Sequence, residues 1–410
     1  MYSFVNIRPA NKFVSLSHLF DTPVPRSKFD SFLMIHIGNH AIGEYPLLLA
    51  PMEDVSDPPF RVLCKEQGAD VVYTEFISSE GLIRYADKSV EKLDIYDAER
   101  PVGIQIFGHD IEAMRMTARI VEQARPEILD INYGCPVKKV TCKGAGAGIL
   151  RDIDKMERLT REIVQSTDLP VTVKTRLGWD QHTIKIVEVA LRLQDTGIKA
   201  LSIHGRTRKQ MYKGEADWTL IQEVAAHPDI EIPIFGNGDV DSPQQAAKMR
   251  SEYPDVSGIM IGRGSIGNPW LFDRIKHYLH TGELLPEPTL QERVEMCRRH
   301  LEMSMVWKGE LVGIREMRRH YPAYFRGLPG FKPLRMTLVT SDDKQELLDT
   351  LAYVENEYDP GQAAIAAAKA PTPSRPKPQL NLRHGRTVRN KLHLPEASQQ
   401  PVPPEVSCAS

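Results

Sequence analysis

Eight short apolar runs, separated by segments with helical spacing, constrain the fold of this chain more than any other feature. Each run is nearly continuous in apolar residues, as expected for strands that are buried on both faces of a parallel sheet. Prolines 101, 170 and 233 stand at the starts of three runs, where a missing N–H is tolerated. The runs are Leu47–Pro51, Val71–Glu75, Val102–Phe107, Ile128–Asn132, Val171–Thr175, Ala200–His204, Ile232–Gly236 and Val256–Gly262.

Between the runs, apolar residues recur at the spacing of amphipathic helices. Asp110, Asp152 and the pair Asp241-Ser242 stand where N-caps belong. Strands that alternate with helices predict a parallel sheet, and eight strands favour closure into a (β/α)8 TIM barrel. The alternative is an open doubly wound sheet, but no G-x-G-x-x-G motif follows the first run. The helical segments include Ile111–Ala124, Ile153–Gln165, Thr183–Gln194 and Pro243–Glu252.

Polar residues stand at the carboxyl end of nearly every run. In a closed barrel these ends surround one mouth, which is where such barrels carry their sites. Each residue alone has an ordinary explanation as a cap, a turn residue or a salt-bridge partner, but their recurrence at one place in the strands makes them candidates. They are Pro51 and Met52, Glu75, Gln105, Asn132 and Cys135, Lys174 and Arg176, His204 and Arg206, Asn237 and Asp239, and Gly262 and Arg263.

Cys135 lies on a Gly-Cys-Pro turn directly after the fourth run, with Lys138 and Lys139 close behind. A lone Cys-Pro is weak evidence, because a small buried residue beside a turn explains it equally well. The five cysteines are scattered and contain no Cys-x-x-Cys pair. This favours reduced thiols and a cytoplasmic protein over a disulfide framework or a structural zinc site, and we expect no metal.

The last two runs are followed by glycine-rich turns, Gly236–Asp239 and Gly262–Gly267. Such loops bind phosphate in barrels of this class, and Arg263 adds positive charge. Simple tight turns are the alternative. The phosphate could belong to a substrate or to a flavin mononucleotide (FMN). Lys174 and His204 suit the flavin, because cationic or donor groups near its pyrimidine edge stabilise the anionic reduced ring.

The strand–helix alternation ends near residue 286. Leu290–Trp307, Glu310–His320 and Lys344–Tyr358 are predicted helices, so a small all-helical domain follows the barrel. Residues 308–335 are rich in Lys and Arg, and Arg315, Arg318 and Arg319 would share one helix face. His320, Tyr321, Tyr324 and Phe325 are interleaved with them. This pattern suits RNA backbone contacts and base stacking, but a solvated basic face with a buried aromatic edge is equally compatible with it.

The predicted organisation is an N-terminal extension at 1–33, a catalytic FMN-binding barrel at 34–285, a helical domain at 286–358 and a disordered Pro-, Arg- and Lys-rich tail at 359–410. Met34 is a candidate for the physiological start. The net charge of −2 requires an RNA partner to meet a local basic face. No apolar run is long enough to span a membrane.

Long motifs occur in a fixed order: LAPMEDVSDPPFR at 49–61, INYGCPVKKVTCKGAGAGILRD at 131–152, VKTRLGW at 173–179, GNGDV at 236–240, IGRGSIGNPW at 261–270 and REMRRH at 315–320. On these motifs, the chain from about Leu48 to Asp342 resembles the tRNA-dihydrouridine synthases, and most of all their bacterial B-type branch. The family motif N-x-G-C-P-x-x-K-V around the catalytic cysteine is intact. The resemblance implies an FMN barrel with a helical tRNA-binding domain that reduces the 5,6 double bond of uridines in tRNA.

The resemblance also implies roles for single residues. Cys135 would be the catalytic acid, and NADPH or NADH would be the transient reductant of a monomeric enzyme with no membrane contact. Asn132, Lys139, Arg176 and Arg206 would line the uracil side of the mouth. Independently of the resemblance, the spacing of Arg315, Arg318 and Arg319 makes them the candidate tRNA contacts. The flavin contacts would be Pro51, Met52, Gln105, Lys174, His204, Asn237, Gly238, Asp239, Gly262 and Arg263.

Three other functions remain open at this stage. An FMN barrel could act on a free pyrimidine-like small molecule, although such a substrate needs no basic helical domain. A non-enzymatic RNA-binding protein is disfavoured by the intact Cys135, Lys174, His204 and Arg263. A phosphate-binding isomerase or aldolase without flavin would give a colourless protein.

Overall fold

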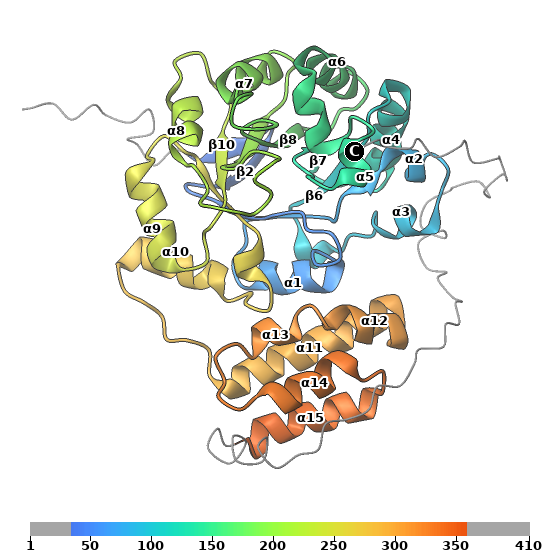
Figure 1. Ribbon diagram of the computed structural model, residues 1–410, viewed down its shortest axis with the longest axis vertical. Helices are drawn as coiled ribbons and strands as arrows, with labels where there is room; N and C mark the ends of the chain where they lie inside the picture. The colour runs from blue at the N-terminus through green and yellow to red at the C-terminus, as the bar shows by residue number, and fades with distance from the viewer. Residues whose placement is uncertain (1–33, 359–410) are drawn as a thin grey trace, which may run out of the picture.

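The computed structural model describes residues 34–358. They form a barrel that is followed by a set of packed helices (Figure 1). The predicted extension at 1–33 and tail at 359–410 lie outside the described residues.

Eight parallel strands close into the barrel. Neighbours pair in the order β4-β3-β11-β10-β9-β8-β7-β6, and a further parallel pairing of β4 with β6 closes the circle. This confirms the (β/α)8 barrel and excludes the open doubly wound sheet. The strands are β3 (Leu47–Leu49), β4 (Val71–Tyr73), β6 (Val102–Phe107), β7 (Ile128–Tyr133), β8 (Val171–Arg176), β9 (Ala200–His204), β10 (Ile234–Asn237) and β11 (Gly258–Ile261).

A hairpin of β1 (Ile35–Ile37) and β2 (His40–Gly43) packs against the interior of the barrel. Ile35, Ile37 and Ile42 join one apolar cluster with side chains of the barrel strands. The turn at Gly38 lies against Pro170, which directly precedes β8, so the hairpin covers the amino end of the barrel. The sequence pattern indicated only that order begins near Ile35. The hairpin leaves the carboxyl end as the open mouth.

An outer layer of helices covers the strands, and the largest apolar cluster lies between the two layers. Helix α7 begins at Ile186 and not at Thr183 as predicted, because Ile184 is held in an isolated antiparallel bridge with Gly178. The helices are α1 (Pro58–Glu66), α4 (Ile111–Gln123), α6 (Ile153–Val164), α7 (Ile186–Gln194), α8 (Thr219–Ala226), α9 (Pro243–Glu252) and α10 (Leu271–Thr281). Shorter elements are β5 (Ile77–Ser78), α2 (Ser79–Leu82), α3 (Asp87–Glu91) and α5 (Lys138–Thr141).

The predicted N-caps are confirmed. The side chain of Asp110 accepts a hydrogen bond from the N–H of Ala113, and Asp152 and Ser242 cap α6 and α9 in the same way. We expect Asp110→Ala to lower the free energy of unfolding by about 1 kcal/mol, because one N–H at the start of α4 loses its partner. Asp110→Asn keeps an acceptor oxygen and should lose much less. Urea denaturation of both variants checks this, and equal losses would contradict the cap.

The C-terminal helices form their own apolar core. They are α11 (Leu290–Lys308), α12 (Glu310–Met317), α13 (Tyr321–Tyr324), α14 (Lys332–Thr340) and α15 (Lys344–Asn356). Helix α12 ends at Met317 and not at His320 as predicted. Pro322 has no N–H to offer to the carbonyl of Arg318, so the helix cannot continue and α13 starts again at Tyr321.

Of the two alternatives left open for the aromatic residues, the structure agrees with a buried aromatic edge and not with stacking on RNA. His320, Tyr321, Tyr324 and Phe325 are all buried, with at most 2% of each residue exposed. His320 packs against Phe60 of α1, with ring centroids 4.9 Å apart. These rings form the buried edge of the helical core, because aromatic rings gain more from packing than from exposure in the free protein.

The helical region docks onto the barrel beside α1 (Figure 1). Arg299 of α11 donates two hydrogen bonds to Glu66, at 2.5 and 2.6 Å. The indole N–H of Trp307 donates to Asp94 at 2.8 Å, and Arg319 lies 2.8 Å from a carboxylate oxygen of Asp54. These contacts hold α13 beside the mouth of the barrel.

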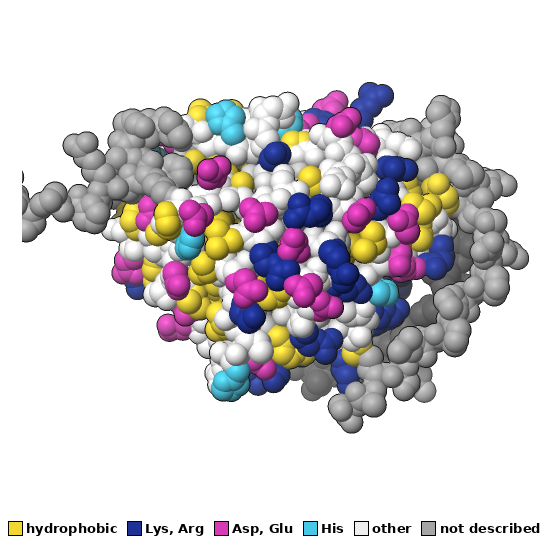
Figure 2. Space-filling view, turned by 90° about the horizontal axis from the view of Figure 1, so that it is seen from above, with side chains coloured by type: hydrophobic (Ala, Val, Ile, Leu, Met, Phe, Trp, Pro, Cys, Tyr) yellow, Lys and Arg dark blue, Asp and Glu magenta, His cyan; other side chains and the backbone are white. Residues whose placement is uncertain are grey.

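The face of the barrel that points away from α11–α15 carries Lys and Arg side by side with Asp and Glu (Figure 2). Mixed charge of this kind produces no strong field of one sign. No helix within residues 34–358 combines the length and the apolar character that crossing a membrane requires.

Candidate active site

A cavity of about 1100 Å³ opens at the carboxyl ends of the barrel strands and reaches α13 of the helical region. The parallel topology explains it, because all eight strands end at the same side of the barrel. Most of the site residues predicted from the sequence line this cavity. They are Pro51, Met52, Asn132, Cys135, Lys174, Arg176, His204, Asn237, Gly238, Asp239, Gly262 and Arg263.

Asn132 holds the turn that carries Cys135 in place. The side-chain oxygen of Asn132 accepts hydrogen bonds from the N–H groups of Gly134 and Cys135, at 2.9 and 2.8 Å. Its side-chain nitrogen donates to Gln105, and Gln105 donates to the carboxylate of Asp130. Gln105 is fully buried and supports the floor of the cavity from beneath, so it does not line the cavity.

The thiol of Cys135 is suited to giving up a proton and not to nucleophilic attack. Only 7% of the residue is exposed, and burial raises the pKa of the Cys135 thiol above its ordinary value. The nearby Arg176 guanidinium opposes this shift. A thiol with a raised pKa stays protonated at neutral pH, which a general acid requires.

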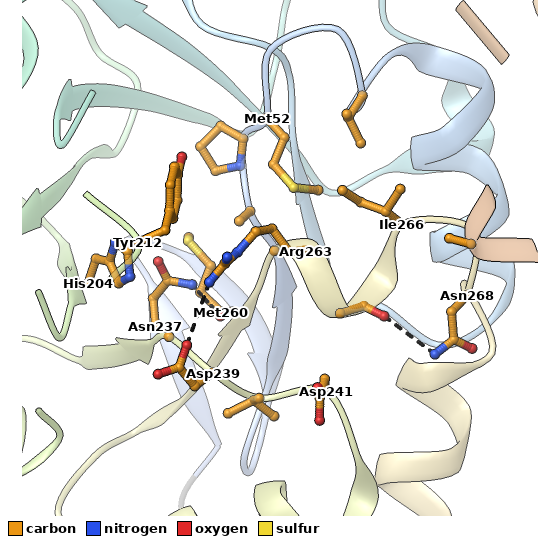
Figure 3. A pocket seen from close by; sticks show the side chains of 18 of the residues that line it. Met52, His204, Tyr212, Asn237, Asp239, Asp241, Met260, Arg263, Ile266 and Asn268 are labelled. Atoms are coloured by element: carbon orange, nitrogen blue, oxygen red, sulfur yellow. Dashed lines mark hydrogen bonds and ion pairs between the residues drawn. The ribbon is translucent and has the colours of Figure 1, made fainter. Parts of the chain in front are cut away.

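Lys174, His204 and Asn237 lie on the adjacent strands β8, β9 and β10, and β8 pairs with β7, the strand that precedes the Cys135 turn. The Lys174 ammonium donates to the side-chain oxygen of Asn237 at 2.9 Å. Burial, together with Arg176, lowers the pKa of Lys174 to about 7. Burial and the surrounding cations lower the pKa of His204 as well, so its imidazole is neutral. Figure 3 shows His204 and Asn237 on one side of the cavity.

The glycine-rich loops after β10 and β11 form the remaining wall. A side chain at Gly262 would point toward Ala50 and Met52, both at 3.7 Å, and would take up space beside the cavity. At Gly238 (φ +130°) a side chain would strike Ala216 at 2.6 Å. Gly238 therefore requires glycine, whereas the contacts at Gly262 are ordinary van der Waals distances.

Arg263 supplies positive charge at this wall. More than half of its side chain is exposed, and it lies 3.6 Å from a carboxylate oxygen of Asp239 (Figure 3). Asp239 is anchored by Arg206 at 2.6 Å and by the N–H of Ala216 at 2.7 Å. Burial acts to raise the pKa of Asp239, but these hydrogen bonds hold it below its usual value. The donors and the glycine wall together fit a flavin mononucleotide.

Other predicted residues lie elsewhere. Arg206 is buried behind the wall, where it also donates to the carbonyl oxygen of Gly214, and Lys139 is exposed on α5 and does not line the cavity. The side chains of Arg315 and Arg318 both bind Asp342, whereas Arg319 binds Asp54. The three arginines therefore do not share one face, because α12 ends before Arg318.

Sequence reasoning missed Tyr212 as a site residue. It lines the cavity with 52% of the residue exposed, and its ring lies 4.6 Å from the guanidinium carbon of Arg263 and 5.7 Å from that of Arg176 (Figure 3). An aromatic residue between Lys209 and Lys213 was the available signal. This loop has neither the alternation of a strand nor the spacing of a helix, so its sequence does not indicate that Tyr212 faces the cavity. Arg293 and Arg326 of the helical region also line the cavity.

Comparisons with known proteins agree with this geometry. The family model described as dihydrouridine synthase (Dus) matches residues 48–358. A protein of Pseudomonas putida named tRNA-dihydrouridine synthase B is 39% identical over 309 residues, which cover 74% of this chain and 90% of the relative. A protein of Vibrio vulnificus with the same name is 36% identical over 322 residues, which cover 78% of this chain and 98% of the relative.

Solved structures are more distant. A structure of a variant of NCR from Zymomonas mobilis has a TM-score of 0.44 at 17% identity and covers 64% of this chain and 94% of its own. The family match spans both the barrel and the C-terminal helices, and the relatives align over nearly their whole length. The chain therefore belongs to the dihydrouridine synthase family.

Proposed function

We propose that this protein reduces the 5,6 double bond of specific uridines in tRNA to dihydrouridine, with bound FMN and with NADPH or NADH as the reductant. The observation that carries the proposal is the thiol of Cys135, whose pKa is raised by burial and which lines the same cavity as Lys174, His204 and Asn237. The relatives named tRNA-dihydrouridine synthase B support tRNA as the substrate.

The flavin would lie along the wall formed by β8–β11. Lys174, His204 and Asn237 would contact the ring system, and Gly238, Gly262 and Arg263 would hold the phosphate. Pro51 and Met52 lie on the loop after β3, while Gln105 and Asp239 keep the contacting residues in place. When bound, the reduced flavin supplies a hydride to C6 of the uracil ring.

Cys135 completes the reduction with a proton. The electron pair of the C5–C6 double bond takes the proton from the Cys135 sulfur, so a C5–H bond forms as the S–H bond breaks. The thiolate left behind then regains a proton from solvent. Asn132 holds the turn so that the sulfur faces the cavity, and the guanidinium of Arg176 lies close enough to stabilise the thiolate. We propose Asn132 and Arg176 as the residues of the uracil side, whereas Lys139 lies outside the cavity and Arg206 supports the flavin wall through Asp239.

The target uridine must leave its stack to reach Cys135 inside the barrel, which costs a few kcal/mol and less for a loop nucleotide. We propose that the helical domain at 286–358 orients the tRNA and that Arg315, Arg318 and Arg319 contact its backbone. Arg315 and Arg319 each keep more than 40% of their side chains exposed beside their ion pairs. Phosphate contacts position the substrate without reading its sequence.

The decisive experiment incubates unmodified tRNA with the full-length protein, FMN and NADPH, and then measures the nucleosides by mass spectrometry. Uridine should gain the mass of two hydrogen atoms, and nuclease fragments locate the position. No gain, with a flavin that binds and is reduced, would move the assignment to a free pyrimidine-like substrate. A colourless protein that binds no flavin would contradict the cofactor itself.

Arg319 allows a test of the tRNA contact. We expect Arg319→Ala to weaken tRNA binding and to reduce the slope of log Kd against log salt by about one, because one phosphate contact is lost. Filter binding at several salt concentrations measures both. Arg250→Ala, on α9 beside Tyr45, is the matched control and should change neither. An unchanged slope for Arg319→Ala would remove Arg319 from the interface.

A further inference from the structure

Trp179 lies on the loop after β8, half-buried at the edge of the main apolar core. The guanidinium carbon of Arg151 lies 4.5 Å from the centre of its ring system, and that of Arg208 lies 4.6 Å from it. Tryptophan is the strongest cation–π partner among the side chains. Within residues 34–358, neither arginine forms an ion pair with a carboxylate. The indole ring is therefore the shared partner of both cations.

The two guanidinium groups hold the loop that begins at Cys135. Arg208 donates to the carbonyl oxygen of Pro136 at 3.1 Å and to the hydroxyl of Thr141 at 3.3 Å. Arg151 donates to the carbonyl oxygen of Thr141 at 3.2 Å and to that of Gly148 at 3.4 Å. The first of these acceptors belongs to Pro136, the residue that follows Cys135. The loop is thus held at both ends and in the middle.

An aromatic ring and a carboxylate bind an arginine side chain in different ways. A carboxylate binds a guanidinium in its plane and occupies the N–H groups, whereas an aromatic ring binds the flat face. Stacking on Trp179 leaves the N–H groups of both arginines free to bind the loop carbonyls. The backbones of the two supporting loops are also joined, because Arg208 donates its N–H to Gly178 and Lys209 donates its N–H to Trp179, at 2.9 and 3.0 Å.

We propose that Trp179, together with Arg151 and Arg208, is a positioning device that fixes the Cys135 loop so that its thiol meets the substrate. This inference rests on the proposed function, since it assigns residues that support the same proton donor. None of the three touches the reacting atoms. Arg151, Trp179 and Arg208 lie on the loops that follow the neighbouring strands β7, β8 and β9. Their contacts therefore join these three loops beside the thiol.

The first test needs no tRNA. Iodoacetamide alkylation of Cys135 in the full-length protein is followed by peptide mass spectrometry at a series of pH values. Trp179→Ala should raise the alkylation rate about tenfold and move its pH midpoint downward, because a loosened loop exposes the thiol to water. Trp179→Phe keeps a ring and should lie near wild type, and Arg250→Ala should equal it. An unchanged rate and midpoint in Trp179→Ala would overturn the proposal.

The second test separates the half-reactions. In Trp179→Ala, flavin reduction by NADPH and the Kd for tRNA should stay at wild-type values, while oxidation of the reduced enzyme by saturating tRNA should slow by about tenfold or more. Arg208→Lys should be intermediate, because it keeps the charge and loses the fork of donors. A weaker Kd with an unchanged saturated rate would show direct RNA contact and overturn the proposal.

Two further outcomes are distinguishable. If wild-type enzyme is not oxidised by tRNA, the proposed function fails, while the alkylation test still decides whether Trp179 positions the loop. If Trp179→Ala does not fold, Arg208→Gln replaces it in both measurements. Arg208→Gln should also raise the alkylation rate of Cys135. If its rate equals that of the wild-type protein, the proposal is overturned.

Discussion

Replacing Cys135 by alanine should lower the rate of dihydrouridine formation by about 10²–10⁴-fold, the usual contribution of a positioned acid. Only the rate of the proton-transfer step should fall. Cys135 contacts Asn132 through its backbone N–H, which alanine retains, so the turn and the cavity should persist. Flavin content, flavin reduction by NADPH and the Kd for tRNA should therefore match wild type. Single-turnover oxidation by tRNA is the measurement.

Cys135→Ser is the matched variant for this prediction. A hydroxyl has nearly the same size but is a far weaker acid, so the rate should stay close to that of the alanine variant. Dihydrouridine formation at the wild-type rate by either variant would remove Cys135 from the mechanism. A loss of flavin or tRNA binding would instead assign it a structural role.

The activity of the wild-type enzyme should depend on pH through the protonation of the Cys135 thiol. A general acid is active while it is protonated, so activity is lost as the pH rises through its pKa. Burial raises that pKa, so the alkaline midpoint of tRNA-dependent oxidation should lie above the ordinary thiol value of about 8.5. The midpoint should vanish in Cys135→Ala. A midpoint near pH 7 would mean that another group controls the rate.

Lys174→Met should reduce turnover by about 10²–10³-fold, the loss seen when one donor to a developing anion is removed. Lys174 is partly buried and donates to Asn237 at the wall assigned to the flavin. Methionine has a similar length without charge or donors, so the variant tests the ammonium group specifically. Flavin affinity and the rate of flavin reduction by NADPH are the readouts, and wild-type values for both would contradict the assignment.

The same substitution should stabilise the flavin-free protein. The pKa of Lys174 is lowered to about 7 in the folded state from 10.5, so between these values the unfolded chain binds more protons. The cost to the folded state is fully present below about pH 7 and disappears as the pH rises past 10.5. Lys174→Met removes this cost, which is on the order of a few kcal/mol, although Asn237 loses a donor.

Thermal unfolding at several pH values tests the stability effect. The advantage of Lys174→Met over wild type should be largest at neutral pH and should shrink toward pH 10. Lys199→Met, at an exposed position just before β9, is the control and should show no such trend. If Lys174→Met is less stable than wild type at pH 7, the charged Lys174 side chain does not destabilise the folded protein.

The arrangement of the barrel could be read from local features. Apolar runs, helical spacing and capping residues such as Asp110 depend on neighbours along the chain, and the strands and helices form where these features predict them. Parallel pairing then places every strand end at one mouth, so twelve of the candidate residues named from strand ends or glycine turns line one cavity. This inference needed only the order of the elements.

The partner of each side chain was not determined by local sequence. Arg206 and Lys139 seemed equivalent to Arg176, yet one is buried behind the wall and the other does not line the cavity. His320 and Tyr324 resembled stacking residues, but His320 packs against Phe60, far away in the sequence, and Tyr324 belongs to the core of the C-terminal helices. Tyr212 and Trp179 lie in loops, where no period predicts which way a side chain points.

Periodicity and caps act over a few residues, so the barrel, the C-terminal helices and the set of strand ends that meet at the mouth could be predicted without the structure. The tertiary structure was needed to show how the cations are paired, with Arg206 on Asp239, Arg315 on Asp342 and Arg319 on Asp54. Such ion pairs, like the stack on Trp179, join loops that closure of the barrel and docking of the helices bring together. Their energies depend on burial and distance, which no local pattern encodes.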